Sequence, residues 1–327
     1  MVFSYFRSTS ANLFLMLTLG LNLAIAQPFS PTHQIRLVVG FGGGTPPDIA
    51  ARIVAEKLAK LQGMPVIVEN IVGASGNLAG EHVARAAPDG HTLLLIPNSG
   101  ILINPSLFRK MSFDPLKDIV PVSVIYSYPN VLIANKELGV ENVQQLVALA
   151  RSKPGSLSYG SAGAGTTMHL AGEILKSMAG IDIQHVPYRG GTNLFVDLMT
   201  SRIQFSFVPT TSTLEQVRYG AVKILAVTSS KRFSLLPDVP TMQELGFPGF
   251  DVNVWWGIVA PVMTPPAIVA NLQRDLAAIV ALPDVRSRFA KLGVEPVGST
   301  AEEFAGLIKA EAPKWRRMIK DMNLAVE

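Results

Sequence analysis

The residues with the clearest chemical potential lie in a glycine-rich turn near the middle of the chain. From Ser158 the sequence reads SYGSAGAGTTMHLAGEILKSMAGIDIQHVPYRG, which predicts a strand, a turn, an amphipathic helix and a second strand. A glycine-rich turn at the start of a helix presents unpaired backbone N–H groups beside the positive end of the helix dipole. Such a turn binds an anion without any cationic side chain.

A second turn of the same kind lies near the N-terminus. After the strand-like segment Gln34–Gly40 the chain continues FGGGTPPDIAARIVAEKL. Thr45 fits the N-cap of a helix and Asp48 its third position, and this structural role is preferred for both residues over direct ligand contact. Three successive glycines weaken a fold unless the backbone needs positive φ or a ligand approaches closely. The two turns predict two anion-facing loops that close on one small ligand.

Hydroxyl groups add to the anion-binding chemistry of both turns. Thr45 in the first turn, and Ser161, Thr166 and Thr167 in the second, are expected to donate charge-assisted hydrogen bonds to carboxylate oxygens. His169 lies in the first turn of the second helix and is expected either to steady the loop or to touch the ligand.

Catalytic, metal and cofactor chemistry have weaker support. The segments around Ser75 and Ser161 each lack one glycine of the G-x-S-x-G nucleophile elbow. The five histidines show no metal-binding spacing and there is no cysteine, so no metal site is expected. Thr45 stands where the last glycine of a dinucleotide-binding fingerprint belongs, and no cofactor is expected.

The first 26 residues have the features of a secretory leader. Arg7 supplies a positive charge, Leu13–Ala26 is an apolar run shorter than a typical membrane span, and Ala24-Ile25-Ala26 is an A-x-A cleavage site. We expect cleavage after Ala26, with a membrane anchor as the alternative. No later stretch of the sequence is long and apolar enough to span a bilayer, so a soluble periplasmic protein is expected.

Composition is that of a globular chain with a small net positive charge. The formal charge is +4, and its basic residues are scattered apart from a cluster around Lys314–Arg317. That cluster is predicted to be a solvated helix face, and no nucleic-acid partner is expected. The chain after the leader is long enough for one large domain or two modest ones.

Short β-branched runs alternate with helical segments, which predicts an α/β fold with mostly parallel sheets. Strands are predicted over Ile35–Val39, Val66–Glu69, Thr92–Ile96, Val131–Ala134, Leu157–Tyr159, Ile183–Val186, Ile203–Val208 and Ile224–Val227. Helices are predicted over Pro46–Gln62, Gly76–Ala86, Val143–Arg151, Thr166–Met178, Thr192–Thr200, Leu214–Tyr219, Pro265–Ala281, Pro283–Leu292 and Glu302–Met322.

Two stretches interrupt this alternation, Val120–Asn135 and Phe250–Pro261. We interpret them as crossings between two lobes, with residues 27–127 and 251–327 in the first lobe and 128–250 in the second. Ligands of open parallel sheets bind at the carboxyl ends of the strands, so both glycine turns are expected to face the cleft between the lobes.

An ordered series of short motifs runs along essentially the whole chain after the leader. The motifs are F-x-x-G-x-x-x-D-x-x-A-R (Phe41–Arg52), V-x-V-E-N (Val66–Asn70), G-A-x-G-N (Gly73–Asn77), A-x-P-D-G-x-T-L-L (Ala86–Leu94), P-x-L-F (Pro105–Phe108), G-x-G-T-x-x-H-L (Gly163–Leu170), H-V-P-Y-R-G (His185–Gly190), P-D-V-P-T-x-x-E-L-G (Pro237–Gly246) and W-x-G-x-x-A-P (Trp255–Pro261) with Thr264-Pro265. Each motif alone is weak, but in this order they resemble the periplasmic receptors of tripartite tricarboxylate transporters, the Bug/TctC type.

The resemblance implies a two-lobed type-II periplasmic-binding-protein fold that closes on a small carboxylate. Such receptors hold the carboxylate mainly through backbone amides, hydroxyls and ordered waters. Carried over by position, the ligand-binding residues are Phe41, Gly43, Gly44, Thr45, Asn98, Ser99, Ser161, Ala162, Gly163, Gly165, Thr166, Thr167, Tyr188 and Asp197. Arg189 is expected to pair either with a ligand carboxylate or with a surface acid.

The sequence departs from the common family pattern in the first turn and in the segment after the second strand. Gly42-Gly43 stands where prolines are frequent, which bears directly on ligand selection. Ile71-Val72 replaces a basic residue and a proline, and Ser75 stands where glycine is common; both are expected to be packing variants.

These features predict a monomeric periplasmic binding protein, without enzymatic activity, that passes a small organic acid to membrane permease subunits. Two alternatives stay open. One is a secreted hydrolase that uses Ser161 or Ser75 and needs a base within hydrogen-bond reach. The other is a receptor whose liganded form docks on a signalling kinase.

Overall fold

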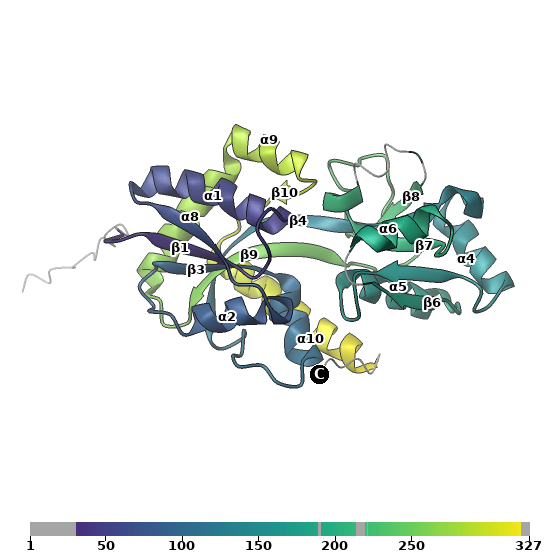
Figure 1. Ribbon diagram of the computed structural model, residues 1–327, viewed down its shortest axis with the longest axis horizontal. Helices are drawn as coiled ribbons and strands as arrows, with labels where there is room; N and C mark the ends of the chain where they lie inside the picture. The colour runs from purple at the N-terminus through teal and green to yellow at the C-terminus, as the bar shows by residue number, and fades with distance from the viewer. Residues whose placement is uncertain (1–30, 189–190, 214–219, 221, 322–327) are drawn as a thin grey trace, which may run out of the picture.

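The computed structural model describes residues 31–188, 191–213, 220 and 222–321 (Figure 1). The predicted leader, Arg189 and the predicted helix Leu214–Tyr219 lie outside the described residues. Two α/β lobes lie side by side along the long axis of the molecule, each with helices packed on its part of the sheet (Figure 1). Among the described residues, none of the helices combines the length and hydropathy of a bilayer span.

The first lobe is built on five strands in the order β2-β1-β3-β9-β4, with β10 also pairing with β4. Strands β1, β2 and β3 are parallel, and β9 runs antiparallel to β3 and β4. Its strands are β1 (Ile35–Val39), β2 (Val66–Asn70), β3 (Thr92–Pro97), the first part of β4 (Ile119–Asn135), β9 (Asn253–Pro261) and β10 (Glu295–Pro296). Its helices are α1 (Pro46–Gln62), η1 (Ala74–Gly76), α2 (Asn77–Ala84), η2 (Ser99–Ile103), α3 (Asn104–Leu107), α8 (Pro266–Ala281), α9 (Pro283–Lys291) and α10 (Ala301–Asp321).

The second lobe continues the same sheet from the other end of β4. Strands β7 and β8 both pair antiparallel with β4, and β5 lies parallel to β7 and β6. Its remaining elements are η3 (Lys136–Leu138), α4 (Val143–Ser152), β5 (Ser158–Ser161), α5 (Thr167–Ala179), β6 (Gln184–Pro187), α6 (Gly191–Met199), β7 (Phe205–Pro209) and β8 (Val222–Val227).

Strand β4 joins the two lobes without a break. Residues from Ile119 to Pro129 pair with β9, and residues from Asn130 to Asn135 pair with β7 or β8. The sequence predicted a proline-bearing crossing here with only a short strand inside it, whereas the structure has one continuous strand. A register shift after Pro121 lets the strand accommodate that proline, because a bulge tolerates a residue without an N–H donor.

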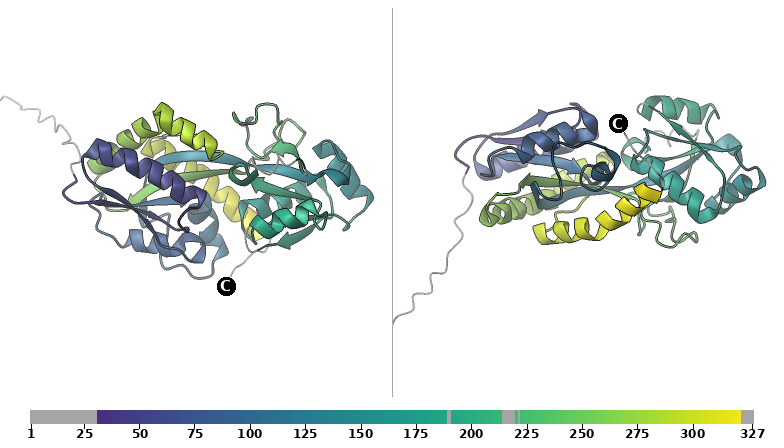
Figure 2. Two further views of the ribbon diagram at one scale, coloured as in Figure 1. Left: turned by 45° about the horizontal axis from the view of Figure 1, so that its top comes forward. Right: turned by 90° about the horizontal axis from the view of Figure 1, so that it is seen from below.

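Helix α10 also reaches from one lobe toward the other. It packs against β4 of the first lobe, and its C-terminal turns approach α5 of the second lobe (Figure 2). The two lobes are therefore connected on one side by a helix as well as by a strand.

Strands β1 and β3 of the first-lobe sheet are buried on both faces, and the residues of β1 alternate between two cores as a pleated strand requires. Ile35, Leu37 and Val39 of β1 pack in the cluster that contains α1, α8 and α9, whereas Val38 packs in the cluster that contains α2 and α10. Burial on both faces explains why these strands read as continuous apolar runs in the sequence.

Candidate functional site

The first glycine turn is closed by hydrogen bonds between its own residues. The Thr45 hydroxyl donates to the Gly42 carbonyl at 2.6 Å, and the Gly44 N–H donates to the Asp48 carboxylate at 2.9 Å. Thr45 is the N-cap of α1, with extended φ and ψ of −74° and 158°. Gly44 has φ +80°, a left-handed conformation that favours glycine.

A buried polar network fixes this turn to the neighbouring strand. Asp48 is 2% exposed, and its carboxylate accepts hydrogen bonds from Arg52 Nε at 2.9 Å and Asn70 Nδ2 at 3.0 Å. Asn70 Nδ2 also donates to the carbonyl of Phe41. Burial raises the pKa of Asp48, but the bonds from Arg52, Gly44 and Asn70 outweigh it and lower that pKa below its ordinary value.

The second glycine turn repeats the geometry of the first, 121 positions later in the chain. The Thr166 hydroxyl donates to the Gly163 carbonyl at 2.8 Å, and Thr166 caps α5 with φ −70° and ψ 157°. The Gly165 N–H donates at 3.1 Å to His169 Nδ1, again four residues ahead, and Gly165 has φ +77°. The two turns thus share one backbone design, with a carboxylate acceptor in the first and an imidazole acceptor in the second.

This geometry corrects the role predicted for the hydroxyls. Thr45 and Thr166 donate to carbonyls of their own turns, and Ser161 Oγ donates to the Gly163 carbonyl at 2.9 Å. A hydroxyl has one proton, so these three shape the turns instead of donating to a carboxylate. The hydroxyl of Thr167, half-buried at the start of α5, has no partner among the described residues.

A cluster of histidines lies beneath the second turn. His185 Nε2 is 2.7 Å from Ser161 Oγ, and the rings of His169 and His185 are stacked with centroids 3.9 Å apart. Burial lowers the pKa of both rings, that of His185 to about 4, and His169 adds to the effect on His185. Both imidazoles are therefore neutral near pH 7, and His169 steadies the turn as an acceptor.

The structure places the remaining predicted residues around the ends of the strands. Asn98, directly after β3, is buried, and its Nδ2 donates to the carbonyl of Asn253 at 2.9 Å. Its Oδ1 atom is buried with no partner among the described residues, as is Oδ1 of Asn253. Tyr188 donates to Asp197 at 2.9 Å, and burial together with this bond raises the pKa of Tyr188 to about 12. Ser99 is half-buried in the first turn of η2.

A series of contacts links the second turn to the first lobe. Gly165 packs so closely against Leu107 of α3 that a methyl group would collide with that side chain. Asn104, also in α3, donates to the Ser75 carbonyl at 3.3 Å, and Gly76 lies beside the ring of Phe41. The two turns therefore approach the same segment of the first lobe, α3 and the loop between β2 and α2.

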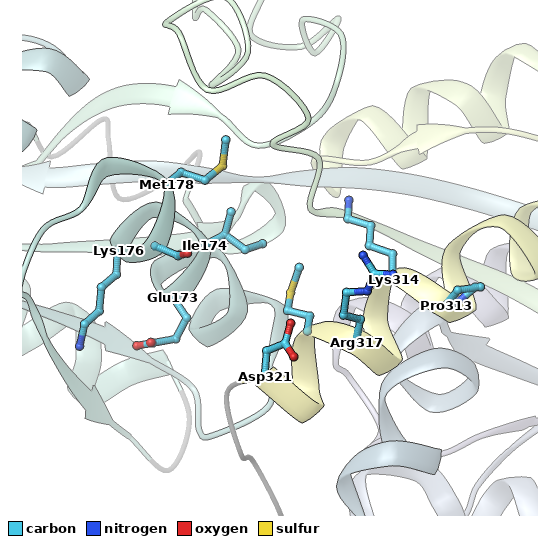
Figure 3. A pocket seen from close by; sticks show the side chains of 10 residues that line it. Glu173, Ile174, Lys176, Met178, Pro313, Lys314, Arg317 and Asp321 are labelled. Atoms are coloured by element: carbon cyan, nitrogen blue, oxygen red, sulfur yellow. The ribbon is translucent and has the colours of Figure 1, made fainter.

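A groove of about 790 Å³ lies elsewhere, between α5 and α10 (Figure 3). Glu173 and Met178 of α5 face Lys314 and Arg317 of α10 across it. None of the predicted ligand residues lines this groove. It is open and walled by the flanks of two helices, whereas the glycine turns carry the amide donors that the predicted chemistry needs.

One group of potential metal ligands among the described residues lies near the N-terminal ends of β1 and β3, whereas the first glycine turn follows the C-terminal end of β1. Donor atoms of His33, Asp89 and His91 lie within 4.8 Å of one another. The two imidazole rings are stacked, with centroids 3.7 Å apart and an interplanar angle of 7°. An ion bound in the plane of one ring cannot lie in the plane of the other, so this arrangement does not fit a metal site.

Sequence reasoning missed three residues that position the turns. Arg52 and Asn70 belong to the Asp48 network, and His185 holds Ser161. All three occur within motifs quoted above, but only the folded chain brings them to the turns.

Comparisons with known proteins agree with this fold. Residues 50–324 match the family described as "Tripartite tricarboxylate transporter family receptor". A protein of Pseudomonas sp. (strain P51), from the tcbD-tcbE intergenic region, is 35% identical over 90% of this chain and 88% of its own length. BugT of Bordetella pertussis is 32% identical over 93% of this chain and 94% of its own.

Solved structures give the same result. R. palustris Rpa4515 with adipate has a TM-score of 0.79 at 33% identity and covers 90% of this chain and 99% of its own. The periplasmic binding protein BugD has a TM-score of 0.75 at 33% identity, covering 90% and 100%. MatC from Rhodopseudomonas palustris with bound malate has a TM-score of 0.74 at 31% identity, covering 88% and 99%. The predicted periplasmic-binding-protein fold is confirmed, and this chain belongs to the tripartite tricarboxylate transporter receptor family.

Proposed function

We propose that this protein is a monomeric periplasmic receptor that captures a small organic carboxylate, a di- or tricarboxylate or a related acid, without transforming it. It delivers that ligand to the membrane permease subunits of a tripartite tricarboxylate transporter. The leader is cleaved after Ala26, and the two lobes, 27–127 with 251–327 and 128–250, close on the ligand. Adipate and malate in two related structures support the ligand class.

The single observation that carries this proposal is the matched geometry of the two glycine turns. Each holds a left-handed glycine before a helix, Gly44 or Gly165, and each exposes backbone amides at its tip. Oriented amides at helix starts favour an anion by about 0.3–1 kcal/mol each when exposed and up to about 2 kcal/mol when partly buried. The proposed contacts are Phe41, Gly43, Gly44, Thr45, Asn98, Ser99, Ser161, Ala162, Gly163, Gly165, Thr166, Thr167, Tyr188 and Asp197.

A carboxylate screen by thermal shift and calorimetry tests the proposal. A ligand that binds only the folded protein at about 100 times its Kd adds about 2.7 kcal/mol to the free energy of unfolding. We expect saturable binding of at least one organic acid. Absence of binding across a broad panel of carboxylates contradicts the proposal.

The short Ser161–His185 distance favours one second candidate, a serine-dependent hydrolase. A nucleophile needs a base in reach, and 2.7 Å meets that requirement. However, Ser161 is fully buried and its hydroxyl donates to the Gly163 carbonyl. The His185 ring is stacked on His169 and also contacts the Tyr159 ring at a tilt. Labelling by a serine-directed probe that is lost in Ser161→Ala supports the hydrolase, and absence of labelling contradicts it.

A further inference from the structure

Strand β4 joins the two lobes (Figure 1), and its residue Tyr128 packs against a core of each. Tyr128 lies where β4 changes partners, since pairing with β9 continues to Pro129 and pairing with β7 starts at Asn130. Its half-buried ring packs on the first-lobe cluster that contains α1, α8 and α9 and on a second-lobe cluster that contains β8 and α6. Among the described residues, no other hydrophobic side chain is shared by these two clusters. Tyr128 therefore lies at the junction of the lobes.

Tyr128 is linked to the first glycine turn through Trp256. Tyr126 pairs with Trp256 and Tyr128 with Val254, so the three aromatic side chains lie on one face of the sheet. Trp256 Nε1 donates to the Tyr128 hydroxyl at 3.4 Å. The Trp256 ring packs edge-on against Phe41, with centroids 5.3 Å apart. A row of contacts thus runs from β4 to Phe41 at the start of the first turn.

The second glycine turn starts near the same junction. It follows Ser161, the last residue of β5, and β5 runs parallel to β7. Pro209, the last residue of β7, lies opposite Asn130 of β4, two positions beyond Tyr128. Because neighbouring strands lie about 4.8 Å apart, the end of β5 is about 10 Å from β4. Ala162 of this turn packs on the same second-lobe cluster as Tyr128. Tyr128 therefore lies between the two turns.

The Tyr128 hydroxyl keeps a proton that it can donate. Its oxygen accepts from Trp256 Nε1, and among the residues that the structure describes none accepts its proton. Burial raises the pKa of Tyr128 to about 12, although the bond from Trp256 acts in the opposite direction, so the phenol stays protonated near pH 7. A tyrosine hydroxyl whose ring is buried usually finds a hydrogen-bond partner. Ligand sites are typically lined by aromatic rings with a few polar groups that fix orientation.

We propose that Tyr128 is a ligand-binding residue whose hydroxyl donates a hydrogen bond to a carboxylate oxygen of the acid held between the two turns. The turns supply backbone amides from either lobe, whereas Tyr128 supplies a neutral side-chain donor from the strand that joins them. A hydrogen bond to a carboxylate is charge-assisted and stronger than one between neutral groups. This inference rests on the proposed function and adds to it a residue that lies outside the family motifs.

Tyr128→Phe tests the proposal, because it removes the hydroxyl and keeps the ring. We expect calorimetry to show binding weakened about tenfold or more for the tightest-binding acid of the carboxylate panel, which includes adipate and malate. Tyr126→Phe is the matched control, since this buried tyrosine of the same strand also stacks on Trp256, with centroids 6.0 Å apart. It should bind the same acid as tightly as the unaltered protein does.

Two results overturn the inference and leave the proposed function standing: unchanged affinity in Tyr128→Phe, or equal weakening in Tyr126→Phe. Absence of binding by the unaltered protein across the panel contradicts the proposed function and this inference together. Thermal unfolding without an acid checks that the variants fold. A Tyr128→Phe protein that does not fold also overturns the inference, since the hydroxyl would then serve the fold.

A double variant separates direct donation from an effect through Trp256. Trp256→Phe removes the indole donor and leaves both the Tyr128 hydroxyl and an aromatic ring beside Phe41. If Tyr128 donates to the acid, adding Tyr128→Phe to Trp256→Phe still weakens binding about tenfold or more. If the second substitution has no effect on affinity, Tyr128 only positions Trp256, and the inference is overturned.

Discussion

The imidazole rings of His169 and His185 lie face to face, with centroids 3.9 Å apart. Each ring contacts the second turn: His169 Nδ1 accepts a hydrogen bond from the Gly165 N–H, and His185 Nε2 contacts Ser161 Oγ. Protonation of His169 at Nδ1 would remove the acceptor for the Gly165 N–H. Protonation of both rings would place two positive charges in contact. Glu173, 4.0 Å from His169 Nε2, partly offsets the effect of burial on that ring.

These contacts predict that stability falls as the pH falls. Both pKa values lie below the ordinary value of 6.5, so the unfolded chain binds protons before the folded chain does. The contribution of this pair is complete above about pH 6.5 and is lost as the pH drops toward about 4, the pKa of His185. Urea unfolding at a series of pH values measures this slope. His185→Gln should flatten it, and an unaltered slope in that variant would exclude the pair as its source.

Removal of the Asp48 carboxylate should destabilise the first turn. In Asp48→Ala the Gly44 N–H, Arg52 Nε and one Asn70 amide N–H lose a buried carboxylate acceptor, and loss of a hydrogen bond to a charged group costs about 1.5–3 kcal/mol. Urea unfolding provides the measurement. Lys60→Ala removes an exposed ion pair of the same helix and should cause no measurable change. Equal effects of the two substitutions would argue against the buried network.

Gly165→Ala should cost more than an alanine at another left-handed glycine. Gly165 has φ +77° and packs against Leu107, whereas Gly180 has φ +60° with nothing within 4 Å of its Cβ position. Left-handed backbone alone costs about 1–2 kcal/mol in each variant. The excess loss in Gly165→Ala measures the contact between the lobes, and Leu107→Ala in the same chain should recover it. Identical unfolding free energies for Gly165→Ala and Gly180→Ala would show that Leu107 gives way freely.

Gly172→Ala should destabilise the protein although alanine is the better helix former. A methyl group at Gly172 would collide with the ring of Tyr159, which lies under α5. Overpacking costs about 1–3 kcal/mol, against a helix-propensity gain of about 1 kcal/mol. In Gly306→Ala of α10 no steric contact opposes the gain in helix propensity. Thermal unfolding should therefore show melting-temperature shifts of opposite sign for the two variants. A raised melting temperature for Gly172→Ala would contradict this packing.

Local signals explain why much of the fold could be predicted. Helix α1 has the predicted bounds because Pro46 and Pro47 favour a helix start and Gly63 ends the helix in a left-handed conformation. Strand β4 was predicted only in part, because Pro121 is tolerated through a bulge that depends on pairing with β9. That pairing joins residues more than a hundred positions apart.

The candidate site likewise has features that local sequence signals predict and features that depend on pairing between distant segments. Both glycine turns could be located from sequence, because each combines glycines with a helix start. The roles of the hydroxyls could not be predicted, since Thr45 and Thr166 find their acceptors only when the turns close on Gly42 and Gly163. His185 was missed because parallel pairing of β5 and β6 sets it opposite Tyr159, two residues before Ser161.

The continuity of β4 limits how the lobes can be exchanged between relatives. The boundary proposed at residues 127 and 128 falls inside this strand, where pairing with β9 continues to Pro129 and pairing with β7 starts at Asn130. A chimera that takes its second lobe from another receptor must also inherit a compatible half of β4. A graft made there would otherwise leave the central strand with mismatched neighbours on one side of the joint.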